Sequence, residues 1–377
     1  RIRLLSKRRA IWLRKLWQEE GESGGQVVIT HAAIDAILNE KDNPDSEISW
    51  YAKETSIQHL NEGIALVEQK IKEDQNSRFT NLHQIFKLNQ EESDLFQLCL
   101  AVKLDPSLSR IYAYIQDHAA RGYATEELAV RLFGYGYANI LNTDSPLLNW
   151  QLIREKETAA GEPDLFQCDP FIVQWLLGYE GLDESLVSIA RQIEPGAPLK
   201  NWPVKNTTDS IRRILKDKSK RIRLVIIGPP GSGRRTFAAT LCSRFKKNLL
   251  AIDSDGNEDW HKVFIHAQRL AMLDNYGIAW YGEKALSETW PQGILSVPLQ
   301  FVICEKGQKP LPVPGITDSV VEMHGIPIAE QNKLLKKLVP VSQTWDKKEL
   351  DNLISQHEMS LGDITAMAQK DVQSVEE

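Results

Sequence analysis

A glycine-rich stretch with the residue types to bind phosphate follows an apolar segment at residues 224–227. It consists of Gly228, Pro229, Pro230, Gly231, Ser232 and Gly233. Glycines let the chain turn sharply, so that successive backbone N–H groups can face one concave space. An amphipathic helix pattern begins near Gly233, and its N-terminal dipole would add positive potential there. The spacing therefore predicts a loop that holds nucleotide phosphates.

The residues after this loop depart from the usual pattern. In G-x-x-x-x-G-K-[ST], the lysine contacts the outer phosphates and the hydroxyl holds Mg²⁺. Arg234 and Arg235 stand at those two positions. Thr236 carries a hydroxyl one residue late, about 100° further round the helix, and is the candidate Mg²⁺ ligand. Arginine still neutralises phosphate, although its planar fork differs from an ammonium group. We expect residues 228–236 to bind ATP or ADP, and the pattern leaves Mg²⁺ binding open.

The segments around the loop alternate between strand and helix patterns. Strands are predicted at residues 224–227, 248–253, 277–281, 299–304 and 319–323. A helix pattern lies between the second and third strands, at residues 259–273. Such alternation is typical of a parallel sheet with helices on both faces. The predicted fold class of this part is therefore α/β.

The sequence GPPGSGRRT, the strand order and the segment beginning EQNKLLKKLV resemble an AAA+ ATPase module with a small helical lid. In that family Asp-Glu follows the third strand, where Asp assists Mg²⁺ and Glu activates water. Gly282 and Glu283 follow that strand here. The resemblance therefore implies that the metal carboxylate is missing, and that Glu283 is the candidate catalytic base.

Two further positions differ from that family. Glu305 follows the fourth strand, where a polar sensor is usual, and residues 310–318 contain no arginine finger. An arginine finger is worth ~10³-fold or more in phosphoryl transfer. We therefore expect a degenerate module that binds nucleotide weakly or as a structural ligand and is inactive or weakly active in hydrolysis.

Helical patterns dominate the chain before the loop. Residues 1–20 alternate basic and apolar side chains, and we expect them to pack on their own domain; the alternative is a surface for a membrane or an acidic partner. Further helix patterns lie at residues 31–39, 54–72, 81–104, 106–118, 125–133 and 170–177. Strand patterns occupy residues 147–155 and 164–168. Three helices followed by a two-stranded ribbon is the order of a winged-helix domain.

The charge of this winged-helix-like region argues against nucleic acid. Residues 81–180 hold fourteen acidic and seven basic side chains, a formal charge of −7. Glu126 and Glu127 lie on the candidate recognition helix, where phosphate contacts need Lys or Arg. A protein-interaction or spacer role is the favoured interpretation.

The composition is that of a globular protein of two to three domains: 377 residues, 42% hydrophobic and 25% charged, with net charge −6. Four dispersed cysteines indicate buried, reduced thiols and a cytoplasmic protein. No apolar run is long enough to span a membrane, and the histidines form no metal pattern. The expected regions are a helical segment (1–75), a winged-helix-like domain (76–194), a linker (195–203), the α/β subdomain (204–326) and the lid (327–377).

A narrower resemblance covers most of the chain. The segments NQEESDLFQLCLAVKLDPSLSRIYAYIQ, SPLLNWQLIRE and LFQCDPFIVQWLLG, followed by the phosphate loop, are similar to bacterial winged-helix AAA+ ATPases encoded beside contractile, phage-tail-like injection systems. In that group a degenerate first module commonly precedes an intact second one. The resemblance implies a homo-oligomeric ring that remodels or threads a protein substrate, with injection-system components as partners. The alternatives are a non-enzymatic interaction scaffold with a relict loop and a DNA-dependent ATPase or regulator.

Overall fold

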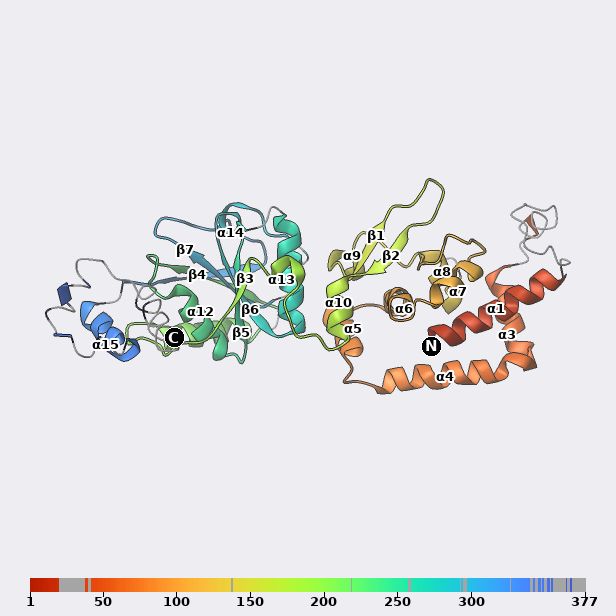
Figure 1. Ribbon diagram of the computed structural model, residues 1–377, viewed down its shortest axis with the longest axis horizontal. Helices are drawn as coiled ribbons and strands as arrows, with labels where there is room; N and C mark the ends of the chain where they lie inside the picture. The colour runs from red at the N-terminus through yellow and green to blue at the C-terminus, as the bar shows by residue number, and fades with distance from the viewer. Residues whose placement is uncertain are drawn as a thin grey trace, which may run out of the picture. The chain divides into compact units, whose positions relative to one another are not determined.

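The computed structural model describes most of the chain, namely residues 1–19, 38–39, 42–136, 138–217, 219–256, 259–291, 293, 297–325, 327–339, 342, 345–346, 348, 351–352, 354, 364 and 367. It divides into two compact units, Arg1–Gly181 and Leu182–Glu377. Each unit is described by itself (Figure 1).

The first unit begins with the helix α1 (Ile2–Glu19) and continues through α3 (Pro44–Lys53), η1 (Thr55–Ile57) and α4 (Gln58–Glu73). Helix α1 buries Trp12, Leu13 and Leu16, and Trp12 contacts Trp50 of α3 at a ring-centroid distance of 5.4 Å. Its buried Arg9 pairs with the carboxylates of Asp42 and Glu47. The interpretation that this segment packs on its own domain is therefore confirmed. The helix predicted at residues 31–39 lies outside the described residues except for its last two positions.

The winged-helix-like part follows in the predicted order. It contains α5 (Arg78–Phe86), α6 (Gln90–Leu104), α7 (Leu108–Ile115), α8 (Glu126–Phe133), α9 (Pro146–Asn149), β1 (Ile153–Lys156), β2 (Leu165–Cys168) and α10 (Pro170–Leu176). Asn89 and Glu92 form a capping box at the start of α6. Thr125 accepts a hydrogen bond from Leu128 N, and Gly134 ends α8 in the left-handed conformation.

The two strands of this part pair antiparallel, with Ile153 opposite Cys168. The strand prediction for residues 147–150 is wrong, because α9 occupies most of that segment. Pro146 stands at the first helical positions of α9, where proline is favoured because no backbone N–H is needed. Alternation of apolar residues over so short a segment did not separate a helical turn from a strand.

The second unit contains a six-stranded sheet in the order β3-β5-β6-β7-β4-β8 (Figure 1). Its strands are β3 (Ala190–Ile193), β4 (Arg221–Ile227), β5 (Asn248–Asp253), β6 (Tyr276–Tyr281), β7 (Leu299–Cys304) and β8 (Ile316–Glu322). The five strands from β4 onward pair parallel with one another. All five predicted strands are thus present, and β8 begins earlier than the apolar pattern indicated.

Helices cover both faces of this sheet. On one face, α11 (Val204–Leu215) and α12 (Arg234–Ser243) share a core with β4, β5 and β7 that includes Phe237 and Phe301. On the other, Phe264 of α13 (Trp260–Leu273) stacks on Trp280 of β6 at 5.2 Å. Trp280 is fully buried, which confirms that it belongs to the core. Burial of both faces explains why β4, β5, β6 and β7 have largely continuous apolar sequences rather than alternating ones.

Strand β3 was not anticipated. It pairs antiparallel with β5, with Ala190 opposite Ile252, so residues 190–193 belong to the α/β sheet although the expected winged-helix boundary lay at residue 194. Part of the expected linker also packs on this unit, because Trp202 is buried edge-on against Phe237 of α12. A short polar strand beside a proline-rich segment gives little sequence signal, since its pairing partner lies far along the chain.

Of the expected lid, the structure describes mainly α15 (Ile328–Leu338). Leu335 and Val339 pack with Ile354 and Ile364 in a small apolar cluster. The four cysteines are free and buried, as predicted. No helix among the described residues is long and apolar enough to cross a lipid bilayer.

Candidate nucleotide site

The glycine-rich loop connects β4 to α12 at the carboxyl edge of the parallel strands. Gly231 and Gly233 have φ values of 73° and 83°, in the left-handed region that glycine enters without strain. Gly228 allows close backbone approach, because a Cβ there would lie 2.8 Å from the carbonyl oxygen of Met323. These glycines turn the chain from β4, an interior strand, directly into the N-terminus of a ten-residue helix, as predicted.

Ser232 lies inside this turn. Ser232 is 3% exposed, and its backbone N–H donates to the carbonyl oxygen of Pro229 at 3.2 Å. Its hydroxyl oxygen is enclosed beside Gly228, with no hydrogen-bond partner in the described part of the chain. An unsatisfied buried hydroxyl is costly, so this oxygen is available to a ligand that reaches the loop. Pro229 and Pro230 are exposed at the tip.

Arg234 stands at the position of the usual lysine and extends toward the end of β7. Its Nη1 donates to the carbonyl oxygen of Cys304 at 2.5 Å. Burial lowers the pKa of this guanidinium, and the neighbouring charge of Arg235 lowers it further, whereas Glu305 raises it. The two arginines therefore lie close enough to repel each other.

Arg235 stands at the position of the usual hydroxyl residue and is exposed. Its guanidinium lies 4.1 Å from the ring centroid of Tyr281, at the end of β6. Among the described residues, neither Arg235 nor Arg234 forms an ion pair with a carboxylate. Two adjacent cations without a directly ion-paired carboxylate among the described residues, beside a helix N-terminus, favour an anionic ligand.

Thr236 is the third residue of α12 and is partly buried. Its methyl group faces Gly196, where a Cβ would lie only 2.6 Å from Thr236 Cγ2. On the next turn, Thr240 donates to the carbonyl oxygens of Gly196 and Thr236. The structure therefore places the candidate Mg²⁺ ligand against the segment that precedes α11.

Glu283 lies at the same sheet edge as the loop, because β6 and β4 belong to one parallel set. It is exposed and immediately precedes the short helix α14 (Lys284–Ser287). Its backbone N–H donates to the carboxylate of Asp255 at 2.7 Å, and Lys284 N donates to the other oxygen at 3.0 Å. Burial raises the pKa of Asp255, but these two hydrogen bonds outweigh that effect and lower it.

Three groups near the loop were not predicted from the sequence. They are the Asp255 carboxylate, the Tyr281 ring that contacts Arg235, and the Cys304 carbonyl oxygen that accepts from Arg234. Asp255 follows β5 within a polar turn, Asp253 to Gly256, which is a signal for local side-chain-to-backbone hydrogen bonds. Every residue has a backbone carbonyl, so the residue type at position 304 could not indicate a contact with Arg234. Glu305, at the expected sensor position, is exposed, and its backbone N–H donates to Gln308 Oε1 at 2.7 Å.

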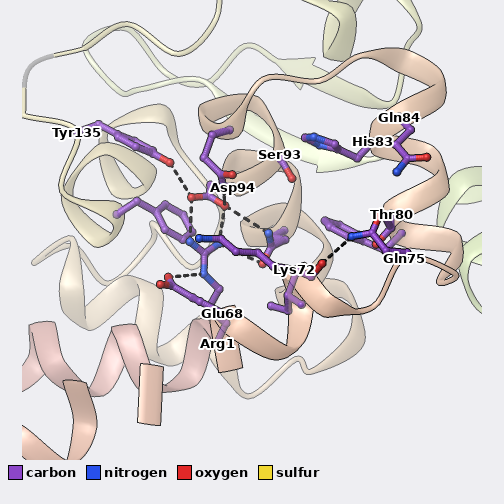
Figure 2. A pocket seen from close by; sticks show the side chains of 15 residues that line it. Arg1, Glu68, Lys72, Gln75, Thr80, His83, Gln84, Ser93, Asp94 and Tyr135 are labelled. Carbon is purple, nitrogen blue, oxygen red and sulfur yellow. Dashed lines mark hydrogen bonds and ion pairs between the residues drawn. The ribbon is translucent and has the colours of Figure 1, made fainter. Parts of the chain in front are cut away.

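A separate cavity of about 640 Å³ lies in the first unit between α4, α5 and α6. Figure 2 shows Asp94 at its centre, contacted by Arg1 and by the hydroxyl of Tyr135, with Glu68 on Arg1. Arg1 therefore pairs with both carboxylates, and these contacts tie the start of the chain to α4 and α6.

Two basic residues of the winged-helix-like part form ion pairs within the first unit. Arg121 pairs with Glu162 at 2.6 Å, and Arg131 pairs with Asp42 at 3.3 Å. Glu126 accepts hydrogen bonds from the backbone N–H groups of Ile140 and Leu141. Since Arg121 and Arg131 are held in ion pairs, neither is poised to neutralise a phosphate backbone.

Part of the chain matches a known protein family. A family model described as "Winged helix domain, variant" matches residues 40–190. No curated protein matches the sequence. Similar solved structures include the AAA domain of FIGL-1 in complex with ADP, with 14% identity over 49% of this chain and 77% of that chain and a TM-score of 0.35. Another is titled "Structural Basis for Katanin Self-Assembly", with 13% identity over 51% of this chain and 78% of that chain and a TM-score of 0.35.

The strand order and the glycine-rich loop define the fold class of the protein. A winged-helix region precedes an α/β module in which a glycine-rich loop joins the interior parallel strand β4 to α12. The fold class predicted from the sequence, a P-loop parallel-sheet module preceded by a mainly α winged-helix-like region, is therefore confirmed.

Proposed function

We propose that this chain is the N-terminal part of an AAA+ ATPase, and that its own P-loop module binds ATP or ADP weakly or structurally with impaired hydrolysis. The observation that carries this proposal is the pair of guanidiniums of Arg234 and Arg235 beside the N-terminus of α12, neither of which forms an ion pair with a carboxylate among the described residues. Backbone amides of residues 231–236 would surround the phosphates, and Arg234 would contact their outer oxygens.

We expect impaired hydrolysis because groups that usually stabilise the transition state are missing. Gly282 replaces the usual metal-assisting carboxylate, and Arg235 stands where a hydroxyl residue is usual. Glu283 alone remains as a base, on an exposed corner where no neighbouring group in the described residues orients it toward the loop. Electrostatic stabilisation of the transition state is usually the largest contribution to catalysis. The loss of several such groups should therefore lower the rate of hydrolysis more than the loss of one.

For the whole protein, we propose a cytoplasmic homo-oligomeric ring that remodels or threads a protein substrate, with components of a contractile injection system as partners. The winged-helix region would supply protein contacts, which its formal charge of −7 over residues 81–180 favours over nucleic-acid contacts. This first module would then contribute ring contacts, substrate docking or regulation.

Hydrolysis by this chain is expected to be slow. We predict a turnover below about 0.01 s⁻¹, roughly 10³-fold below a median enzyme, because the metal carboxylate and an arginine finger are both missing. Single-turnover assays with excess protein and labelled ATP would measure it. Glu283→Gln should lower the residual rate by about tenfold or more, since general-base catalysis contributes at least that much.

The matched control is Glu288→Gln, an exposed glutamate just beyond α14, which should leave the rate unchanged. A wild-type rate near that of ordinary ATPases would contradict impaired hydrolysis. A residual rate that survives Glu283→Gln would remove Glu283 from the role of base.

A further inference from the structure

We infer that this site binds the metal-free form of a nucleoside polyphosphate, with the Arg235 guanidinium taking the place of Mg²⁺. The inference rests on the proposed nucleotide binding and specifies which ionic form of the ligand the site accepts.

The residues present do not fit the metal. A magnesium ion at a phosphate loop needs oxygen ligands, normally the hydroxyl after the loop lysine and a carboxylate at the end of a neighbouring strand. Arg235 occupies the first of these positions and Gly282 the second. A guanidinium carries no acceptor and repels a cation, so this donor set favours an anion without its metal.

Of the carboxylates at this sheet edge, those of Glu283 and Glu305 are exposed, and those of Asp253 and Asp255 accept backbone N–H groups. Both oxygens of Asp255 accept backbone N–H groups at the start of α14. Asp253 Oδ1 accepts the backbone N–H of Asp255 at 3.1 Å. Within the described ranges, no group of three or more His, Cys, Asp or Glu side chains is placed to hold a metal ion.

The positive groups instead match a bare polyphosphate. Arg235 is held over Tyr281 at 4.1 Å, which orients its planar fork, and Arg234 lies beside it. Such a fork donates two parallel hydrogen bonds to phosphate oxygens. Ser232 adds a buried hydroxyl with no partner in the described residues, at the base of the same loop. Prior neutralisation of the phosphates by Mg²⁺ would weaken the attraction to both arginines.

Equilibrium dialysis of the full chain with labelled ATP tests this inference, in excess EDTA and in excess MgCl₂ at matched ionic strength. We expect binding to be at least about threefold tighter in EDTA, because the free polyphosphate carries more charge to the two guanidiniums. Arg235→Thr should weaken binding in EDTA by about tenfold, the loss expected for one charged hydrogen-bonding group, and should shift the preference toward Mg²⁺.

Arg244→Thr, an exposed arginine beyond the far end of α12, is the matched control and should leave the EDTA-to-Mg²⁺ ratio unchanged. Binding that requires Mg²⁺ would overturn the inference and leave the proposed nucleotide binding intact. Equal binding in both buffers, insensitive to Arg235→Thr, would also overturn it. An absence of binding in both buffers would instead reject the proposed function itself.

Discussion

Gly233→Asp is expected to weaken ATP binding by at least about 100-fold, because it places a carboxylate where the phosphates would lie and like charges cost several kcal/mol at close range. Gly233 caps the N-terminus of α12 with φ 83°. An aspartate there would also accept the helix N–H groups that the ligand needs. Competition binding with a fluorescent ADP analogue measures the loss.

The matched control for this variant is Gly315→Asp. Gly315 also has a positive φ, 76°, and a Cβ there meets nothing within 4 Å. It precedes β8, at the opposite edge of the parallel sheet from the loop. The control therefore carries the same backbone strain and the same charge without approaching the site. Equal affinities of Gly233→Asp and Gly315→Asp for nucleotide would show that the ligand does not use this loop.

Asp183→Ala is expected to destabilise the second unit by about 3 kcal/mol, the cost of breaking a buried ion pair. The Asp183 carboxylate lies 2.6 Å from the Arg269 guanidinium and 3.1 Å from His266 Nδ1, and all three residues are buried. The pair anchors the 3₁₀ turn η2 (Glu184–Leu186) to α13. Ser185 Oγ contacts the same His266 nitrogen at 2.7 Å, so this cluster is not a Ser-His-Asp relay, which needs both ring nitrogens.

Amide hydrogen exchange in α13 of the full chain measures this effect, since the two units need not unfold together. Exchange of the protected amides should accelerate on the order of 100-fold for Asp183→Ala. Glu184→Ala, the exposed neighbour, should leave exchange unchanged. An unchanged rate in Asp183→Ala would mean that other contacts of Arg269 and His266 hold the turn.

The same pair makes stability depend on pH. Burial raises the pKa of Asp183, but the hydrogen bond from His266 and the charges of His266 and Arg269 outweigh it and hold the pKa well below the ordinary value. A carboxyl group whose pKa is depressed on folding contributes stability above its unfolded pKa and loses it as pH falls. The contribution should therefore be complete above about pH 5 and decline below about pH 4.

Local signals in the sequence predicted much of the fold. Helix caps are such local signals, because the side chains of Asn89 and Thr125 accept backbone N–H groups only three residues further on. The strand, glycine loop and helix were predicted for the same reason, since residues 224–243 carry all the information needed for that turn. Each of these features depends on contacts that are short in sequence.

The structural features that could not be predicted depend on contacts between residues that are far apart in the sequence. The position of Arg234 is set by a carbonyl oxygen at Cys304, and the edge strand β3 is set by its pairing with β5. Asp183 looked unremarkable in sequence because its partner Arg269 is far along the chain. The candidate site was therefore found from its loop, whereas the partners of its arginines and the use of Asp255 required the structure.

Calorimetric titration of the wild-type chain with ATP tests the central claim most directly. The account predicts a saturable heat of binding with a dissociation constant in the micromolar to low millimolar range, of the order expected for a site that contributes a few charged hydrogen bonds. It also predicts that the heat disappears in Gly233→Asp and persists in Gly315→Asp. A flat titration of the wild-type chain at millimolar ATP would contradict the account and leave an interaction scaffold with a relict phosphate loop.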